Sequence, residues 1–123
     1  MIPAIVLACA LSATECHSLD AQRIASAIDD ATGDDRLRAV LVVYAYHESR
    51  WQVRPAPSSW DARAGVARGP WQLWTGGTLT LRDQARVWLS DVQSAGLAGV
   101  DSSPARASRR AREAQALLGR VGD

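Results

Sequence analysis

One carboxylate, Glu48, falls where the sequence pattern otherwise places apolar side chains. It follows Tyr44 by four residues and Leu41 by seven, so on a helix it continues their apolar stripe. Desolvation on such a stripe favours the neutral carboxyl group, and a position near the carboxyl end of a helix also disfavours the anion. Both effects raise the pKa, as a general acid working near neutral pH requires. The alternative is that Glu48 reaches solvent or pairs with Arg50 or Arg54.

A segment rich in tryptophan follows this carboxylate. Residues 51–79 contain three prolines, four glycines and four of the five tryptophans, and they are expected to form a long loop. Flat aromatic faces beside a polar groove suit sugar binding, because the apolar faces of sugars stack on them. The alternative is that the tryptophans fill the core of a chain that has no phenylalanine. The four residues concerned are Trp51, Trp60, Trp71 and Trp74.

Three short motifs surround Glu48. Residues 48–51 are Glu-Ser-Arg-Trp, residues 58 and 59 are both serine, and residues 65–73 are Gly-Val-Ala-Arg-Gly-Pro-Trp-Gln-Leu. Over residues 40–75 this combination resembles the soluble lytic transglycosylase domain, which has a lysozyme-like fold of the goose type. The resemblance implies that Glu48 is the catalytic acid and base. The residues expected to bind substrate, from the resemblance and from their aromatic character, are Trp51, Ser58, Ser59, Trp60, Gly69, Trp71, Gln72 and Trp74.

The chain also departs from the pattern of that family. The spacing from Glu48 to Gln72 is longer than usual, which indicates an insertion near residues 55–61. The family's downstream Ala-Tyr-Asn-Ala-Gly motif is absent, since the chain has no asparagine and no tyrosine after Tyr46. Trp88 or a loop residue is the candidate to replace the missing tyrosine.

The reaction implied by the resemblance is cleavage of the MurNAc–GlcNAc β-1,4 bonds of peptidoglycan glycan strands, with 1,6-anhydro-muramic ends as products. One alternative is a hydrolytic muramidase of the same fold, for which Asp61 is the candidate second carboxylate. Another is a catalytically impaired module that binds peptidoglycan or forms part of a virion.

His47 adjoins Glu48 but points about 100° away on a helix, so we expect it at the surface or the cleft rim. No spacing of cysteines and histidines suggests a metal, and we expect no cofactor.

Helical periodicity and capping residues set the fold class. We expect a mainly α, lysozyme-like domain over residues 1–123, with a long loop and at most a minimal β element within residues 66–80. The apolar run at residues 2–13, within a signal-like segment 1–17, fits either a secretion signal that lacks its basic start or a buried first helix, and we favour the helix. The further predicted helices run from Ser18 to Gly33, from Asp34 or Asp35 to about Arg50, from Thr80 to Gly96, and from Ser103 onward.

Net charge and cysteine content place only weak limits on the binding partners of the chain and on the cellular compartment in which it acts. A net charge of +1 indicates no strong field towards nucleic acid or membrane, and the four arginines of residues 106–112 are expected on a solvated helix face. Cys9 and Cys16 would lie about 10 Å apart on one helix. A disulfide needs Cα atoms within about 7 Å, so one forms only if the chain bends between them. We expect a monomer that is secreted or associated with a phage virion and that acts on glycan strands in the periplasm or cell envelope. We expect it neither to bind nucleic acid nor to be an integral membrane protein.

Overall fold

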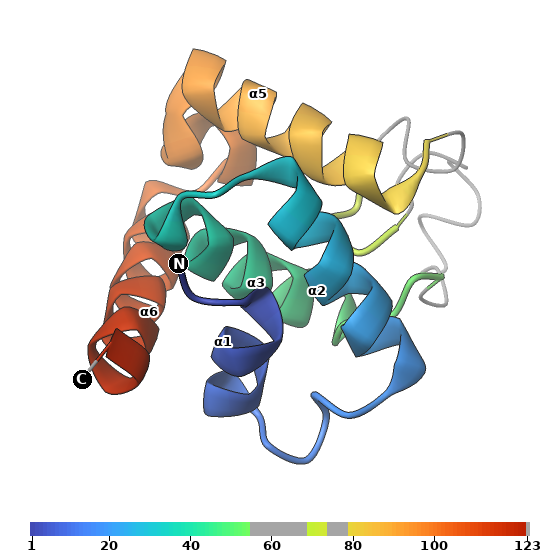
Figure 1. Cartoon of the computed structure of the whole chain (residues 1–123). Coiled ribbons are helices and arrows are strands. Elements are labelled where there is room, and N and C mark those ends of the chain that lie inside the picture. Colours follow the sequence, from blue (N-terminus) through green and yellow to red (C-terminus); the bar gives the residue numbers. More distant parts are fainter. Residues whose placement is uncertain (55–68, 74–78, 123) are drawn as a thin grey trace.

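The structure, a computed structural model, describes residues 1–54, 69–73 and 79–122. Within these ranges the chain forms five helices and no strand, which confirms the prediction of a mainly α fold. Most of the span in which a minimal β element was expected lies outside the described residues. None of the helices in the described ranges is both long and apolar enough to cross a membrane. The helices are α1 (Ala4–Leu11), α2 (Leu19–Ala31), α3 (Asp35–Ser49), α5 (Leu81–Asp101) and α6 (Pro104–Gly122) (Figure 1).

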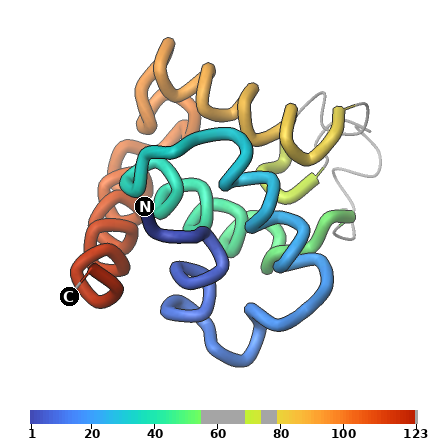
Figure 2. The backbone as a smooth tube through the Cα atoms, in the orientation of Figure 1, coloured from blue at the N-terminus to red at the C-terminus, as the bar shows by residue number. Residues whose placement is uncertain are grey.

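Helix α3 is the centre of the domain. Five consecutive residues, Leu41 to Ala45, are all buried, so this part of the helix is covered on every side and not only along one stripe. Helices α1, α2 and α6 pack around it, and α5 crosses α2 and α6 (Figures 1 and 2). The last turn of α3, which carries Glu48, emerges from this packing at the edge of the domain.

Helices α2, α3, α5 and α6 begin at the residues that the sequence predicts. Each capping side chain accepts a hydrogen bond from a backbone N–H three residues further on, at 3.0 to 3.3 Å. Such a cap stabilises a helix by about 1 kcal/mol. The four caps are Ser18, Asp34, Thr80 and Ser103.

Gly96 interrupts α5 at the residue where the sequence predicts a helix to end. It adopts a non-helical conformation with φ of 76°, yet the chain resumes helical geometry at once and α5 continues to Asp101. The positive φ is inexpensive for glycine, so the residue produces a kink. Leu97 and Val100 beyond the kink pack against the core, which explains why the helix continues.

The amino-terminal segment is tied to α2 and α3 by buried and half-buried polar groups. The backbone N–H of Ile2 donates to Asp35 at 2.7 Å, and that of Ala4 donates to Asp29 at 2.9 Å. The guanidinium of Arg38 is buried and donates to the carbonyl oxygens of Ile2, Asp29 and Thr32. The apolar run at residues 2–13 therefore contains a helix that packs in the core.

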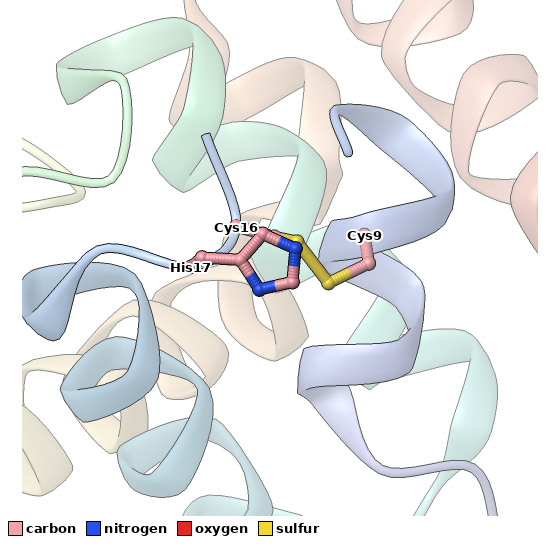
Figure 3. A group of neighbouring side chains, drawn as sticks. All are labelled: Cys9, Cys16 and His17. Carbon is pink, nitrogen blue, oxygen red and sulfur yellow. A yellow bond between two sulfur atoms is a disulfide. The ribbon is translucent and has the colours of Figure 1, made fainter. Parts of the chain in front are cut away.

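A disulfide joins the end of α1 to the approach to α2. Helix α1 ends at Leu11 and the following turn brings Cys9 and Cys16 to a Cα–Cα distance of 5.0 Å, where the bond forms (Figure 3). The bend required for this bond is thus present. With a sequence separation of 7, the loop-closure model gives a stabilisation of about 2.5 kcal/mol.

Candidate functional site

A cavity of about 500 Å³ opens beside the last turn of α3. Its walls come from three separate parts of the chain: α3, the turn at residues 69–73, and α5 with the start of α6. This volume lies within the range of about 300–1,000 Å³ that small-molecule sites occupy. The residues that carry its polar and aromatic character are Tyr44, Glu48, Trp71, Gln72, Trp88, Asp91, Asp101 and Arg106.

Glu48 lines this cavity from the last turn of α3. The sequence stripe predicts a desolvated side chain, whereas the structure leaves the residue exposed on its open side, because the helix has passed the edge of the core. Protein on the cavity side still raises the pKa of Glu48, first through burial and then through the charge of Asp101. Arg106 and Arg110 oppose this rise. Among the described residues Glu48 has no hydrogen bond or ion pair, and Arg50 pairs with Glu15 instead.

A buried carboxylate closes the far side of the cavity. The side chain of Asp101 is only 1% exposed, and it accepts a hydrogen bond from the Tyr44 hydroxyl at 2.5 Å and one from Arg106 Nε at 2.5 Å. Burial raises the pKa of the Tyr44 phenol, and the hydrogen bond and charge of Asp101 raise it further. The phenol therefore remains a proton donor at neutral pH. This group joins α3 to the junction of α5 and α6 and holds the two walls together.

The aromatic residues of the cavity form its floor. Trp71 and Trp88 are each 3% exposed, and the Tyr44 ring lies 5.0 Å from the Trp88 ring, centroid to centroid. The indole N–H of Trp71 donates to the Leu41 carbonyl at 3.0 Å, which fastens the turn at residues 69–73 to α3. A ligand would contact only a small part of either indole ring, because most of each ring is packed in the core.

Gln72 reaches the cavity through an unusual backbone conformation. Its φ is 53°, and its side-chain amide donates to the Gly69 carbonyl at 2.8 Å. Gly69 has a φ of 80°, and a Cβ at this position would overlap the side-chain oxygen of buried Gln84. The structure thus gives Gly69 a packing reason to be glycine, whereas the resemblance implied close approach of the backbone to a sugar.

Trp51 lies away from this cavity. It is 2% exposed, and its indole N–H donates to the Val42 carbonyl at 3.0 Å, which leaves its ring no free face for a sugar. Its small exposed part belongs to a second hollow, on the side of Glu15 and Arg50. His47, on the neighbouring helix position to Glu48, is exposed and pairs with Glu113 at 2.8 Å. The remaining candidates lie outside the described residues, namely Ser58, Ser59, Trp60, Asp61 and Trp74.

The structure adds residues that the sequence pattern did not indicate. Asp91, Asp101 and Arg106 all line the cavity, although none belongs to a recognisable motif. Arg106 was expected on a solvated basic face, yet its side chain turns towards Asp101 at the start of α6. Tyr44 was expected to have only an apolar role. The one feature of the sequence that could have indicated a polar role for Tyr44 is its position one helical turn before Glu48, because this spacing brings its hydroxyl to the same side of α3.

Comparison with known proteins assigns neither a family nor a function to this chain. No protein-family model matches this chain, and neither a curated protein nor a solved structure matches it. The functional interpretation therefore rests on the site and on the sequence motifs around Glu48.

Proposed function

We propose that this chain cleaves the glycosidic bonds of peptidoglycan glycan strands, with Glu48 as the acid and then the base. The observation that carries the proposal is that Glu48, whose pKa is raised, shares one cavity with Gln72 and Trp71. These three residues stand at the positions that the transglycosylase resemblance selects. They come from a helix and from a turn more than twenty positions away, and the cavity unites them.

In the proposed reaction the protonated Glu48 donates its proton to the glycosidic oxygen as the bond from the anomeric carbon breaks. The substrate's own 6-hydroxyl then bonds to that carbon and releases its proton to the Glu48 carboxylate. The product carries a 1,6-anhydro ring, and Glu48 is returned to its acid form. A raised pKa favours the first step, because more of the carboxyl group is protonated near neutral pH. The disulfide fits a protein of the cell envelope, since such bonds persist in oxidising compartments.

The direct test replaces Glu48 by glutamine and follows the turbidity of purified cell walls. Glu48→Gln keeps the size and hydrogen-bonding shape of the side chain but removes its proton chemistry, so we expect lysis to cease and the fold to remain. Glu15→Gln is the matched control, because Glu15 lies at the second hollow and should leave lysis unchanged. Lysis by the Glu48→Gln protein at the wild-type rate would refute the proposal. Walls that bind the wild-type protein but release no soluble fragments would instead favour a binding module.

A hydrolytic muramidase is the second candidate, because two further carboxylates line the same cavity. Both oxygens of Asp101 are engaged by Tyr44 and Arg106, which fits a positioning role. Asp91 makes no hydrogen bond among the described residues and is exposed, so it is the better candidate to activate water. Mass spectrometry of the products separates the two reactions: anhydro-muramic ends indicate the lyase, and reducing ends that disappear in Asp91→Asn indicate the hydrolase.

A further inference from the structure

Three potential metal ligands meet at the turn between α1 and α2, away from the cavity. The sulfur atoms of Cys9 and Cys16 and a ring nitrogen of His17 all lie within 4.8 Å of one another. Figure 3 shows the imidazole of His17 beside the disulfide bond. The described ranges contain no other group of three or more cysteine, histidine or acidic side chains placed this closely. The grouping therefore marks this turn as chemically distinct from the rest of the described surface.

A tetrahedral zinc ion fits between the three ligand atoms once the disulfide is reduced and the side chains rotate. Zinc binds thiolate sulfur at about 2.3 Å and imidazole nitrogen at about 2.0–2.1 Å, so two thiolates on one ion lie about 3.8 Å apart. The Cα atoms of Cys9 and Cys16 are 5.0 Å apart, so rotation of the two side chains brings the free thiolates to this spacing without moving the backbone. The ring nitrogen of His17 lies within 4.8 Å of the sulfur atoms and would need to approach to about 3.6 Å, which rotation of its side chain supplies.

The backbone around His17 is already held in place. Its carbonyl oxygen accepts a hydrogen bond from Gln22 at 3.1 Å, and the next residue, Ser18, is the cap of α2. His17 is exposed, Cys9 is half-buried and Cys16 is fully buried, so the group has one open side. An ion can enter from the His17 side and keep water as its fourth ligand there.

We propose that the reduced chain binds one zinc ion through Cys9, Cys16 and His17, and that zinc and the disulfide are alternative crosslinks between α1 and the start of α2. A dithiol supplies two electrons and two protons to open the disulfide and is itself oxidised to a disulfide. Zinc then displaces the two thiol protons and binds the neutral imidazole. A small-molecule disulfide reverses the exchange: it takes up the two electrons and becomes two thiolates, the Cys9–Cys16 bond forms again, and the ion is released. This inference is independent of the proposed glycan cleavage.

The test measures zinc binding to the full chain, reduced with a phosphine, by competition with a coloured chelator. We expect one zinc ion per reduced chain and no binding at the same concentrations by the oxidised chain. His17→Ala should weaken zinc binding by at least about 10- to 100-fold. This is the loss of metal affinity seen when a residue that only hydrogen-bonds to a metal ligand is removed, and His17 is itself a ligand. The chain's other histidine provides the matched control, because His47 pairs with Glu113 on α6 and His47→Ala should bind zinc as the wild type does. Cobalt in place of zinc should give the absorption of a tetrahedral thiolate complex.

Three results would overturn the proposal. The first is equal zinc affinity of the reduced wild type and a Cys9→Ser, Cys16→Ser variant. The second is equal affinity of the His17→Ala and His47→Ala proteins. The third concerns folding, followed by circular dichroism in the same samples: if reduction abolishes the helices and zinc does not restore them, the site does not exist in the folded chain. Helices that return on addition of zinc support the proposal.

Discussion

Tyr44→Phe isolates the hydrogen bond that joins the two walls of the cavity. The change removes one oxygen atom and keeps the ring against Trp88. Asp101 then loses one of its two side-chain partners while its side chain stays 1% exposed, so water has little access to replace the lost donor. Arg106 remains, but its side chain is 44% exposed and its attraction to Asp101 is partly screened by solvent.

The expected cost follows from the charge of the acceptor. A hydrogen bond to a charged group contributes about 1.5–3 kcal/mol, about twice the value of a bond between neutral groups. A chain of this size loses roughly 3–5 °C of melting temperature per kcal/mol, interpolated between smaller and larger domains, so Tyr44→Phe should lower Tm by about 5–15 °C. The chain's other tyrosine is a matched control. The hydroxyl of Tyr46 donates to Glu15, whose side chain is 37% exposed, so Tyr46→Phe should cost less than about 1 kcal/mol.

The assay is urea unfolding of the wild type and both variants at neutral pH, followed by helical circular dichroism, with a thermal scan of the same proteins. Both variants lose the same hydroxyl oxygen. The difference between their free energies of unfolding therefore reports the environment of each hydroxyl and not the loss of the oxygen itself. Free energies of unfolding for Tyr44→Phe and Tyr46→Phe that agree within about 0.5 kcal/mol, the size of an ordinary surface effect, would refute the reasoning. The bond between Tyr44 and Asp101 would then not be what holds the two walls together.

Two further predictions concern the candidate site. The pKa of Glu48 is raised above 4.5 in the folded chain, so the stability it contributes is fully present below that pH and is lost as the pH rises through the folded-state pKa. Glu48→Gln should therefore gain stability relative to the wild type as the pH rises from acid to neutral, so its free energy of unfolding minus that of the wild type should increase. A difference independent of pH would contradict this. Gly69→Ala should destabilise the chain by about 1–3 kcal/mol, because φ is positive and the new methyl group would overlap Gln84. Gly119→Ala, in α6 with open space around it, should stabilise by about 0.5–1 kcal/mol in the same unfolding assay, and a similar loss in both variants would speak against the packing argument.

The helices were largely predictable because their signals are local. A cap such as Ser18 or Thr80 satisfies a backbone N–H only three residues away, so the sequence carries the whole interaction. The end of α5 was harder to predict. Gly96 is a local signal for a break, but whether the chain stops or kinks there depends on the packing of Leu97 and Val100 against distant parts of the fold.

The cavity likewise has features that short sequence motifs predict and features that only the packing shows. The sequence selected Glu48, Trp71 and Gln72 through short motifs, and all three line it. It did not separate Trp71 from Trp51, because both lie in one tryptophan-rich segment and only the packing shows which ring reaches the cavity. In the structure each indole donates to a different carbonyl of α3, and Trp71 lines the cavity that Glu48 lines whereas Trp51 does not.

The sequence by itself determined the class of the fold, the starts of the helices and the placing of Glu48 in the last turn of α3, since these follow from periodicity and from contacts over a few residues. Only the tertiary structure decided that Asp101 meets Tyr44 across 57 positions and that Cys9 meets Cys16. The physical reason is that such meetings depend on how helices cross and how turns bend. Those features are set by burial of the whole apolar surface at once, and no local pattern encodes them.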